Sequence, residues 1–201
     1  TPTPPPPILS GLVGSEMCIR DSVFGMDTQT AEHDFESLKG LCPAVPSLQQ
    51  VVERFGNKMH LMIEVKHEPY PNPGHQNTIL EAILSNLIPG QDYHLISLDP
   101  EMLELIECVP DHAEMPVAEL NVGKLSEIAL EKNYAGVLGH YFLLNGRLVQ
   151  KHLEAGQKLG SGYPDSRNCM SRELNRGVNW LFSNDAGRLE QIRKAMLAED
   201  G

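Results

Sequence analysis

Short apolar runs alternate with amphipathic segments along most of the chain. Near-continuous apolar runs of roughly four to eight residues are typical of buried strands, and apolar residues at i, i+3, i+4 and i+7 are typical of helices. Each apolar run is followed by a segment with helical spacing, which predicts a parallel sheet. This alternation fits an open doubly wound sheet or part of an eight-unit barrel. The predicted strands span residues 60–66, 93–98, 114–120, 135–140, 158–163 and 179–183.

Start and stop signals define several of the predicted helices. Ser47 is followed three residues later by Gln50, a capping-box pattern that predicts a helix before the first strand. Asp99 stands directly before a proline, which predicts an N-cap with proline at the first helical position. Residues 68–74 contain three prolines and a glycine, so we expect a loop that leaves the carboxyl end of the first strand.

Two opposite charges end the first predicted strand. Glu64 and Lys66 are two residues apart, so on a strand both side chains point to the same face. In parallel α/β folds the carboxyl ends of the strands carry the chemistry. The pair is therefore a candidate site or a structural ion pair. His140 ends another predicted strand at the same face, where it either contacts substrate or is a hydrogen-bonded rim histidine.

Composition limits the classes of partner. The 201 residues carry a formal net charge of −11, which argues against a general nucleic-acid or anionic-membrane binder and leaves room for a local phosphate site. The four cysteines lack CxxC spacing, so neither a zinc site nor a disulfide framework is indicated. No apolar run approaches the ~20 residues of a membrane span, and no signal peptide is visible. We expect no nucleic-acid partner and no stable membrane insertion; compartment and oligomeric state stay open.

The first 22 residues differ in character from the rest. Five of the first seven are prolines, which are excluded from helix interiors and central strands. Residues 13–22 resemble a run produced when sequencing adaptor is translated in frame. We therefore expect residues 1–22 to be a non-native or disordered tail and residues 23–201 to be one barrel domain. On this interpretation the native sequence before Val23 is missing, and any signal peptide with it.

Four stretches occur in order along the chain. They are Pro46-Ser47-Leu48 with Ile63-Glu64-Val65-Lys66; Ile96-Ser97-Leu98-Asp99; Val137 to His140 with Leu143-Leu144; and Arg176 to Asn184. Together they resemble the glycerophosphodiester phosphodiesterase family, within the phospholipase C-like phosphodiesterases, over about Pro46 to Leu197. The resemblance implies a TIM (β/α)8 barrel, here incomplete, with about six of eight strand–helix units.

The resemblance implies a reaction and its residues. A glycerophosphodiester and water would give an alcohol and glycerol 3-phosphate, with Ca²⁺ or Mg²⁺ held by three carboxylates and two histidines as acid and base. Glu64 matches the third metal carboxylate, and Lys66 matches the lysine that faces the phosphate. His140 is expected on the substrate side. A hard cation and an ammonium both stabilise the charge that builds up on phosphoryl oxygens.

The departures from the family pattern bear on activity. The His-Arg, Glu-x-Asp and His-Asp motifs that precede Glu64 in the family are not found here, and upstream of the first strand the sequence offers only His33. No catalytic residue is assigned, and we expect this chain to be inactive as written. Two alternatives stay open: a phospholipase- or sphingomyelinase-D-like lipid phosphodiesterase, and a catalytically dead barrel that acts as a binding module.

Overall fold

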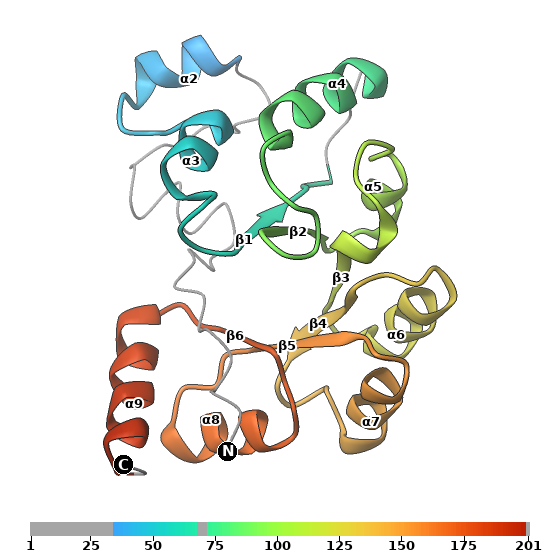
Figure 1. Ribbon diagram of the computed structural model, residues 1–201, viewed down its shortest axis with the longest axis vertical. Coiled ribbons are helices and arrows are strands. Elements are labelled where there is room, and N and C mark those ends of the chain that lie inside the picture. The colour runs from blue at the N-terminus through green and yellow to red at the C-terminus, as the bar shows by residue number, and fades with distance from the viewer. Residues whose placement is uncertain (1–33, 68–71, 200–201) are drawn as a thin grey trace.

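The computed structural model describes residues 34–67 and 72–199. Within them the strands form one parallel sheet whose spatial order, β1 to β6, follows the chain. Figure 1 shows the sheet bending into an open arc, with β1 and β2 in the upper half and β5 and β6 in the lower half. The strands are β1 (Leu61–Glu64), β2 (Tyr93–Ser97), β3 (Glu114–Ala118), β4 (Gly136–His140), β5 (Lys158–Gly162) and β6 (Trp180–Phe182).

The helices lie outside this arc (Figure 1). A doubly wound sheet reverses its strand order and carries helices on both faces. Neither feature is present in the described residues, so the incomplete barrel is confirmed and the open sheet is excluded. The helices are α2 (Phe35–Leu41), α3 (Leu48–Phe55), α4 (Pro73–Leu84), α5 (Pro100–Glu104), the short 3₁₀ helix η3 (Asp111–Ala113), α6 (Val122–Glu131), α7 (Gly146–Glu154), α8 (Arg167–Asn175) and α9 (Ala186–Glu199).

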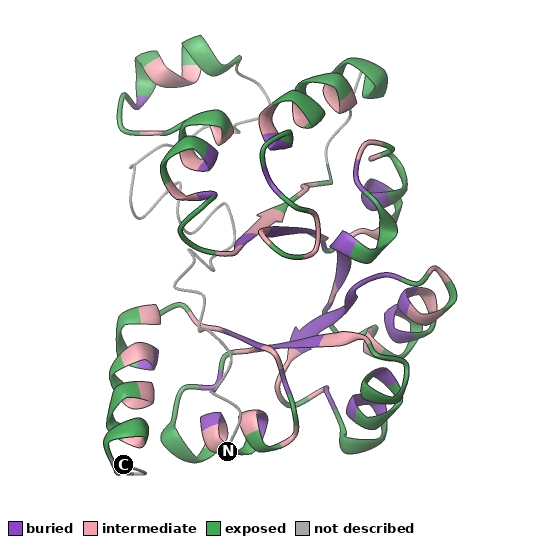
Figure 2. Ribbon diagram, in the orientation of Figure 1, coloured by how far each residue is buried: buried purple, intermediate pink, exposed green. Residues whose placement is uncertain are grey.

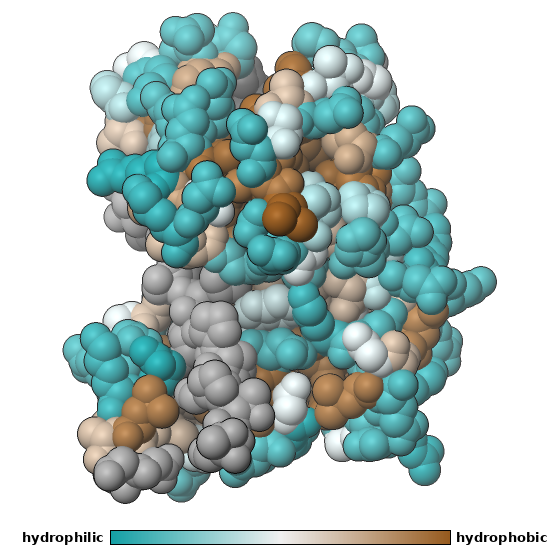
Figure 3. Space-filling view, in the orientation of Figure 1, coloured by the Kyte–Doolittle hydropathy of each residue, from teal (hydrophilic) through white to brown (hydrophobic). Residues whose placement is uncertain are grey.

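Two apolar layers line the two faces of the sheet. The larger layer fills the space between strands and helices and includes Leu95, Val137 and Leu159, all fully buried. The smaller layer lies on the concave face around Met115 and Trp180. Figure 2 shows the strands as the most continuously buried part of the fold, and Figure 3 shows mostly hydrophilic residues over the outer helices. Alternation along each strand places successive side chains in opposite layers.

Local capping explains where several helices begin. Ser47 and Gln50 form the predicted capping box at α3, and Asp99 caps α5 through the backbone N–H of Glu101. The segment predicted as a loop is partly helical, because Asn72 accepts the N–H of His75 and Pro73 occupies the first turn of α4. Proline suits that position because its missing N–H would have no helical partner. Residues 68–71 of the predicted loop lie outside the described residues.

A glycine allows β4 and β5 to come together at their amino ends. Gly136 has φ +153°, and a Cβ placed there would lie 1.7 Å from the carbonyl oxygen of Lys158. Only glycine combines this backbone angle with this approach. None of the helices in residues 34–67 and 72–199 is long and apolar enough to cross a membrane.

The expected boundary at residues 22 and 23 and the candidate histidine His33 fall outside the described residues. The predicted barrel domain is represented by residues 34–67 and 72–199.

Candidate functional site

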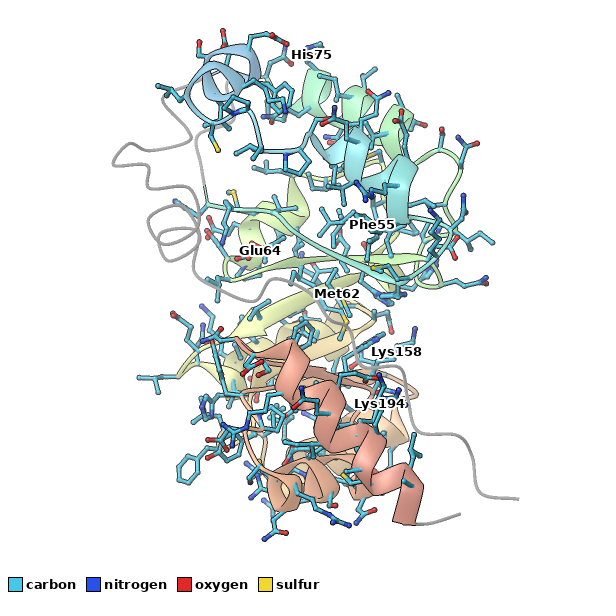
Figure 4. All side chains as sticks on the ribbon, turned by 90° about the vertical axis from the view of Figure 1, so that its left-hand side faces the viewer. Phe55, Met62, Glu64, His75, Lys158 and Lys194 are labelled. Atoms are coloured by element: carbon cyan, nitrogen blue, oxygen red, sulfur yellow. The ribbon has the colours of Figure 1, made fainter. Side chains whose placement is uncertain are left out.

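A cavity of about 810 Å³ follows the concave face of the sheet. Figure 4 looks onto this face and shows Met62 between Glu64, at the carboxyl end of β1, and Lys158, at the amino end of β5. The lining is largely apolar, from Met62 and Leu138 in the strands to the turns beyond them. Barrels of this type carry their chemistry at the carboxyl ends of the strands. Glu64 therefore marks the end of the cavity where a functional site is expected.

Glu64 and Lys66 form the ion pair that their spacing allows. The Lys66 ammonium lies 2.9 Å from Oε1 of Glu64, and each side chain is about one-third exposed (32% and 30%). Glu64 lines the cavity. The strand is less buried than its apolar sequence predicts, since Met62 and Ile63 are only partly buried. The pair therefore exists within reach of solvent, with Glu64 in the cavity lining and Lys66 beside it, outside that lining.

His140 ends β4 and also lines the cavity. Its Nδ1 accepts the backbone N–H of Phe142 at 3.2 Å, so the neutral ring carries its proton on Nε2. The ring stacks on Tyr163, with centroids 5.5 Å apart and planes 28° apart. His140 is thus a hydrogen-bonded rim histidine, and its Nε2–H remains a donor for a ligand.

The described residues do not fit a divalent-cation site. Glu64 shares Oε1 with the Lys66 ammonium, and Glu119 supplies the other carboxylate of the cavity lining. Within residues 34–67 and 72–199 no three histidine, cysteine or carboxylate side chains come together as metal ligands. Ca²⁺ takes roughly six to eight oxygens and Mg²⁺ needs near-octahedral geometry. The role of Glu64 as a metal ligand therefore stays a prediction.

A histidine–carboxylate pair at the same end of the barrel was not predicted. Nδ1 of His67 lies 2.5 Å from Oδ2 of Asp99, which joins the carboxyl ends of β1 and β2. The backbone N–H of Glu101 and then His67 lower the pKa of Asp99. Neither His67 nor Asp99 lines the cavity. We assign the pair to holding the two turns together, and no local pattern reveals a partner 32 residues away.

Apolar side chains surround the mouth of the cavity. Leu120 is 90% exposed and Phe142 is 79% exposed, on the turns that follow β3 and β4. Leu98, after β2, is also exposed, and all three line the cavity. Clustered exposed apolar residues commonly mark a binding surface. Sequence patterns did not identify them, because a loop leucine looks the same whether it is covered or exposed.

The amino end of the barrel holds a polar cluster with structural bonds. Nδ1 of His60 lies 2.7 Å from the carbonyl oxygen of Gln91, and Nδ1 of His94 lies 2.7 Å from Nε2 of His60. This arrangement requires a proton on each Nδ1. Burial lowers the pKa of His94 to about 3, so that ring is neutral at physiological pH. These histidines bridge strands at the end of the barrel that serves stability.

Solved structures of known proteins share this arrangement of strands and helices. No family model and no curated protein matches the sequence. A glycerophosphodiester phosphodiesterase from Thermotoga maritima has a TM-score of 0.67 and 13% identity, covering 86% of this chain and 75% of that one. The corresponding enzyme from Parabacteroides distasonis has a TM-score of 0.58 and 16% identity, covering 78% and 66%.

A phosphodiesterase from Oleispira antarctica, solved in complex with the product sn-glycerol-3-phosphate, has a TM-score of 0.57 and 18% identity. The match covers 74% of this chain and 61% of that one. At such identities the likeness establishes architecture. The described part of this chain has the fold of the glycerophosphodiester phosphodiesterases over six parallel strands and the helices between them.

Proposed function

We propose that this chain forms the phosphate-binding side of a glycerophosphodiester phosphodiesterase, which converts a glycerophosphodiester and water into an alcohol and glycerol 3-phosphate. The observation that carries the proposal is the Glu64–Lys66 pair at the carboxyl end of β1 in a barrel of this fold. The neighbour from Oleispira antarctica, which binds sn-glycerol-3-phosphate, supports the ligand class.

The charges at the mouth suit a phosphodiester. Lys66, which pairs with the cavity residue Glu64, offers a compact ammonium that needs no bidentate geometry, and His140 adds an Nε2–H donor from the cavity lining itself. Both groups favour an anion, and their effect grows as charge builds up on the phosphoryl oxygens.

The only part of a metal site that we propose for this chain is one ligand, Glu64. A bound divalent cation supplies Lewis-acid polarisation of a phosphoryl oxygen, and Glu64 would be one of its ligands. Because the described residues do not fit such a site, the role of this chain rests on binding and orientation by Lys66 and His140.

We predict that the 201-residue chain does not release glycerol 3-phosphate from glycerophosphocholine. The described residues place no metal cluster at the cavity, and of its two lining histidines His60 lies at the amino end, bonded to Gln91 and His94, which leaves His140 alone near Glu64. Hydrolysis needs a positioned acid and base. An enzyme-coupled assay for glycerol 3-phosphate, run with Mg²⁺, with Ca²⁺ and with chelator, measures this. Chelator-sensitive release would show that the chain contains a complete site.

We also predict that Glu64→Gln tightens the binding of sn-glycerol 3-phosphate several-fold when chelator is present. Glu64 competes with the phosphate for the Lys66 ammonium, and glutamine has no charge with which to compete. Calorimetric titration of both proteins at low ionic strength gives the comparison. Weaker binding by Glu64→Gln in chelator would contradict the proposed competition, and Glu53→Gln, an exposed change on α3, is the matched control.

One observation favours a second candidate, a lipid phosphodiesterase. The exposed Leu120 and Phe142 at the mouth suit an acyl chain beside a phosphodiester. A lysophospholipid below its micellar concentration would then bind more tightly than sn-glycerol 3-phosphate, and Leu120→Ser would reduce only the lipid affinity. If the chain binds the lysophospholipid or sn-glycerol 3-phosphate and hydrolyses neither, the result agrees with a catalytically dead barrel that acts as a binding module.

A further inference from the structure

A second cavity lies on the opposite side of the sheet from the proposed site. It has a volume of about 470 Å³, between α5, η3 and the residues that follow α6. Figure 1 shows α5 and α6 on the outer, helix-bearing side of the arc. The volume is in the range of small-molecule sites. Its lining includes four carboxylates, Glu104, Glu107, Asp111 and Glu114, together with Lys132 and Tyr134.

Glu114 distinguishes this cavity from a solvated acidic surface. It begins β3 and points into the layer between sheet and helices, where it is only 2% exposed. Its Oε1 is buried and has no hydrogen-bond partner among the described residues. A buried carboxyl oxygen without a donor has lost its hydrogen bonds to water and gained none in return, which is destabilising. The side chain therefore lacks a donor, and it lines a cavity large enough to admit one.

The lysine of the cavity is held elsewhere. The ammonium of Lys132 lies 2.6 Å from Oε1 of Glu104, at the exposed rim. No hydrogen bond connects Lys132 with Glu114 in the part of the chain that the structure describes. With Lys132 neutralising Glu104, the remaining charge of the cavity is negative and comes from Glu107 and Asp111, and Glu114 adds a further negative charge when it is ionised.

The spacing of these carboxylates favours an organic cation over a metal ion. No three of them come close enough to hold a metal within the described residues. A cation with N–H groups can reach carboxylates that are farther apart, and it supplies the donor that Oε1 of Glu114 lacks. A quaternary ammonium ion carries the same positive charge but has no N–H group to donate to Oε1 of Glu114. The aromatic residue Tyr134 in the lining adds a surface that attracts cations.

We propose that this cavity binds a small organic cation with N–H donors, an alkylammonium or guanidinium compound, through the Glu114 carboxylate. Burial, followed by the charge of Asp111, raises the pKa of Glu114 to about 8, so the empty cavity holds a protonated Glu114 at pH 7. Cation binding expels that proton. Affinity therefore increases as the pH rises from 6 to 8.

Among the groups around the cavity, Glu114 accounts for the pH dependence of cation affinity. Burial raises the pKa values of Tyr93 and Tyr134 to about 12 and also raises that of Cys108, while hydrogen bonding to Glu104 raises the pKa of Lys132. None of these four changes charge between pH 6 and 8. The other charged residues facing the carboxyl are Asp111, on η3, and the cavity residues Glu104 and Glu107.

The test is calorimetric titration of the full chain with n-butylammonium chloride at pH 7, in two buffers with different ionisation enthalpies. Saturable binding with release of about one proton per cation is expected from the linkage. Tetramethylammonium chloride should bind at least tenfold more weakly, because it has no N–H group. Equal behaviour of the two cations, or binding without proton release, would overturn the proposal.

Two variants of the cavity and one control variant complete the test. Glu114→Gln should fold, since glutamine resembles the protonated side chain, and should weaken n-butylammonium binding at least tenfold and abolish proton release. Glu104→Gln frees Lys132 to approach Glu114 and should also weaken binding. Glu190→Gln, on α9 and away from this cavity, should change nothing. Unchanged binding by Glu114→Gln would exclude this carboxylate as the site.

Discussion

Replacing Glu173 with alanine will lower the free energy of unfolding by about 3–5 kcal/mol. Glu173 is fully buried on α8, where it accepts hydrogen bonds from Ser161 on β5 at 2.9 Å and from Arg176. Arg176 in turn donates to the carbonyl oxygen of Leu144 at 2.6 Å. Removing the carboxylate leaves a partly buried guanidinium without its counter-charge, which costs more than the pair gains on folding.

A second glutamate provides the control for this prediction. Glu190 on α9 pairs with Arg193 at the same i, i+3 spacing, with Nε 2.7 Å from Oε2, at the surface. Glu190→Ala should leave the denaturation midpoint nearly unchanged, because exposed pairs are screened by solvent. Urea denaturation of both variants at equal m-value gives the difference. Equal effects of the two substitutions would show that burial of Glu173 is not what makes the first pair important.

Stability will peak near pH 6.5 and fall on both sides, by about 1.4 kcal/mol per pH unit for each dominant group. His94 has a pKa of about 3 in the folded chain and 6.5 as its ordinary value, because burial disfavours its charge. As the pH falls, His94 therefore binds a proton at a higher pH in the unfolded chain than in the folded chain. The stability that neutral His94 contributes is therefore complete above pH 6.5 and is lost as the pH falls toward 3.

Glu114 acts in the opposite direction. Its pKa is about 8 in the folded chain against an ordinary value of 4.5. The folded chain keeps this proton longer, so the stability is complete below pH 4.5 and is lost as the pH rises toward 8. Between pH 4.5 and 6.5 these two effects oppose each other. Burial also lowers the pKa values of His60 and His152, so the net slope there is upward.

Melting temperatures from pH 4 to pH 8.5 test this profile with two variants. Glu114→Gln should flatten the alkaline side and be more stable than the wild-type chain at pH 8. His94→Asn keeps a donor for Nε2 of His60 without titrating in this range, so it should make the acid side shallower. If the melting temperature of Glu114→Gln still falls at alkaline pH, the loss of stability there comes from a group other than Glu114.

Much of the fold could be predicted because its signals are local. The capping box at Ser47 and the proline after Asp99 are complete within four residues, and both helices begin there. The apolar runs predicted the strands of the described sheet in order. The start of α4 was missed because three prolines outweighed the cap at Asn72, although proline is favoured in the first turn of a helix.

The candidate site was predictable only in part. The two-residue spacing of Glu64 and Lys66 placed both side chains on one face, which their ion pair bears out. The pairing of His67 with Asp99 and the isolation of Glu114 depend on segments brought together by folding. The resemblance assigned one metal carboxylate, Glu64, and the motifs that carry the other ligands in the family are not found in the sequence. Among the described residues no three side chains come together as metal ligands, so the role of Glu64 stays a prediction.

Titration of sn-glycerol 3-phosphate into the wild-type chain and into Lys66→Ala tests the central claim most directly. Lys66 lies at the proposed phosphate site, and Lys58→Ala, an exposed change that precedes β1, is the control. The account predicts saturable binding by the wild-type chain and by Lys58→Ala, and at least tenfold weaker binding by Lys66→Ala. Equal affinities of all three proteins, or no binding by the wild-type chain, would contradict it.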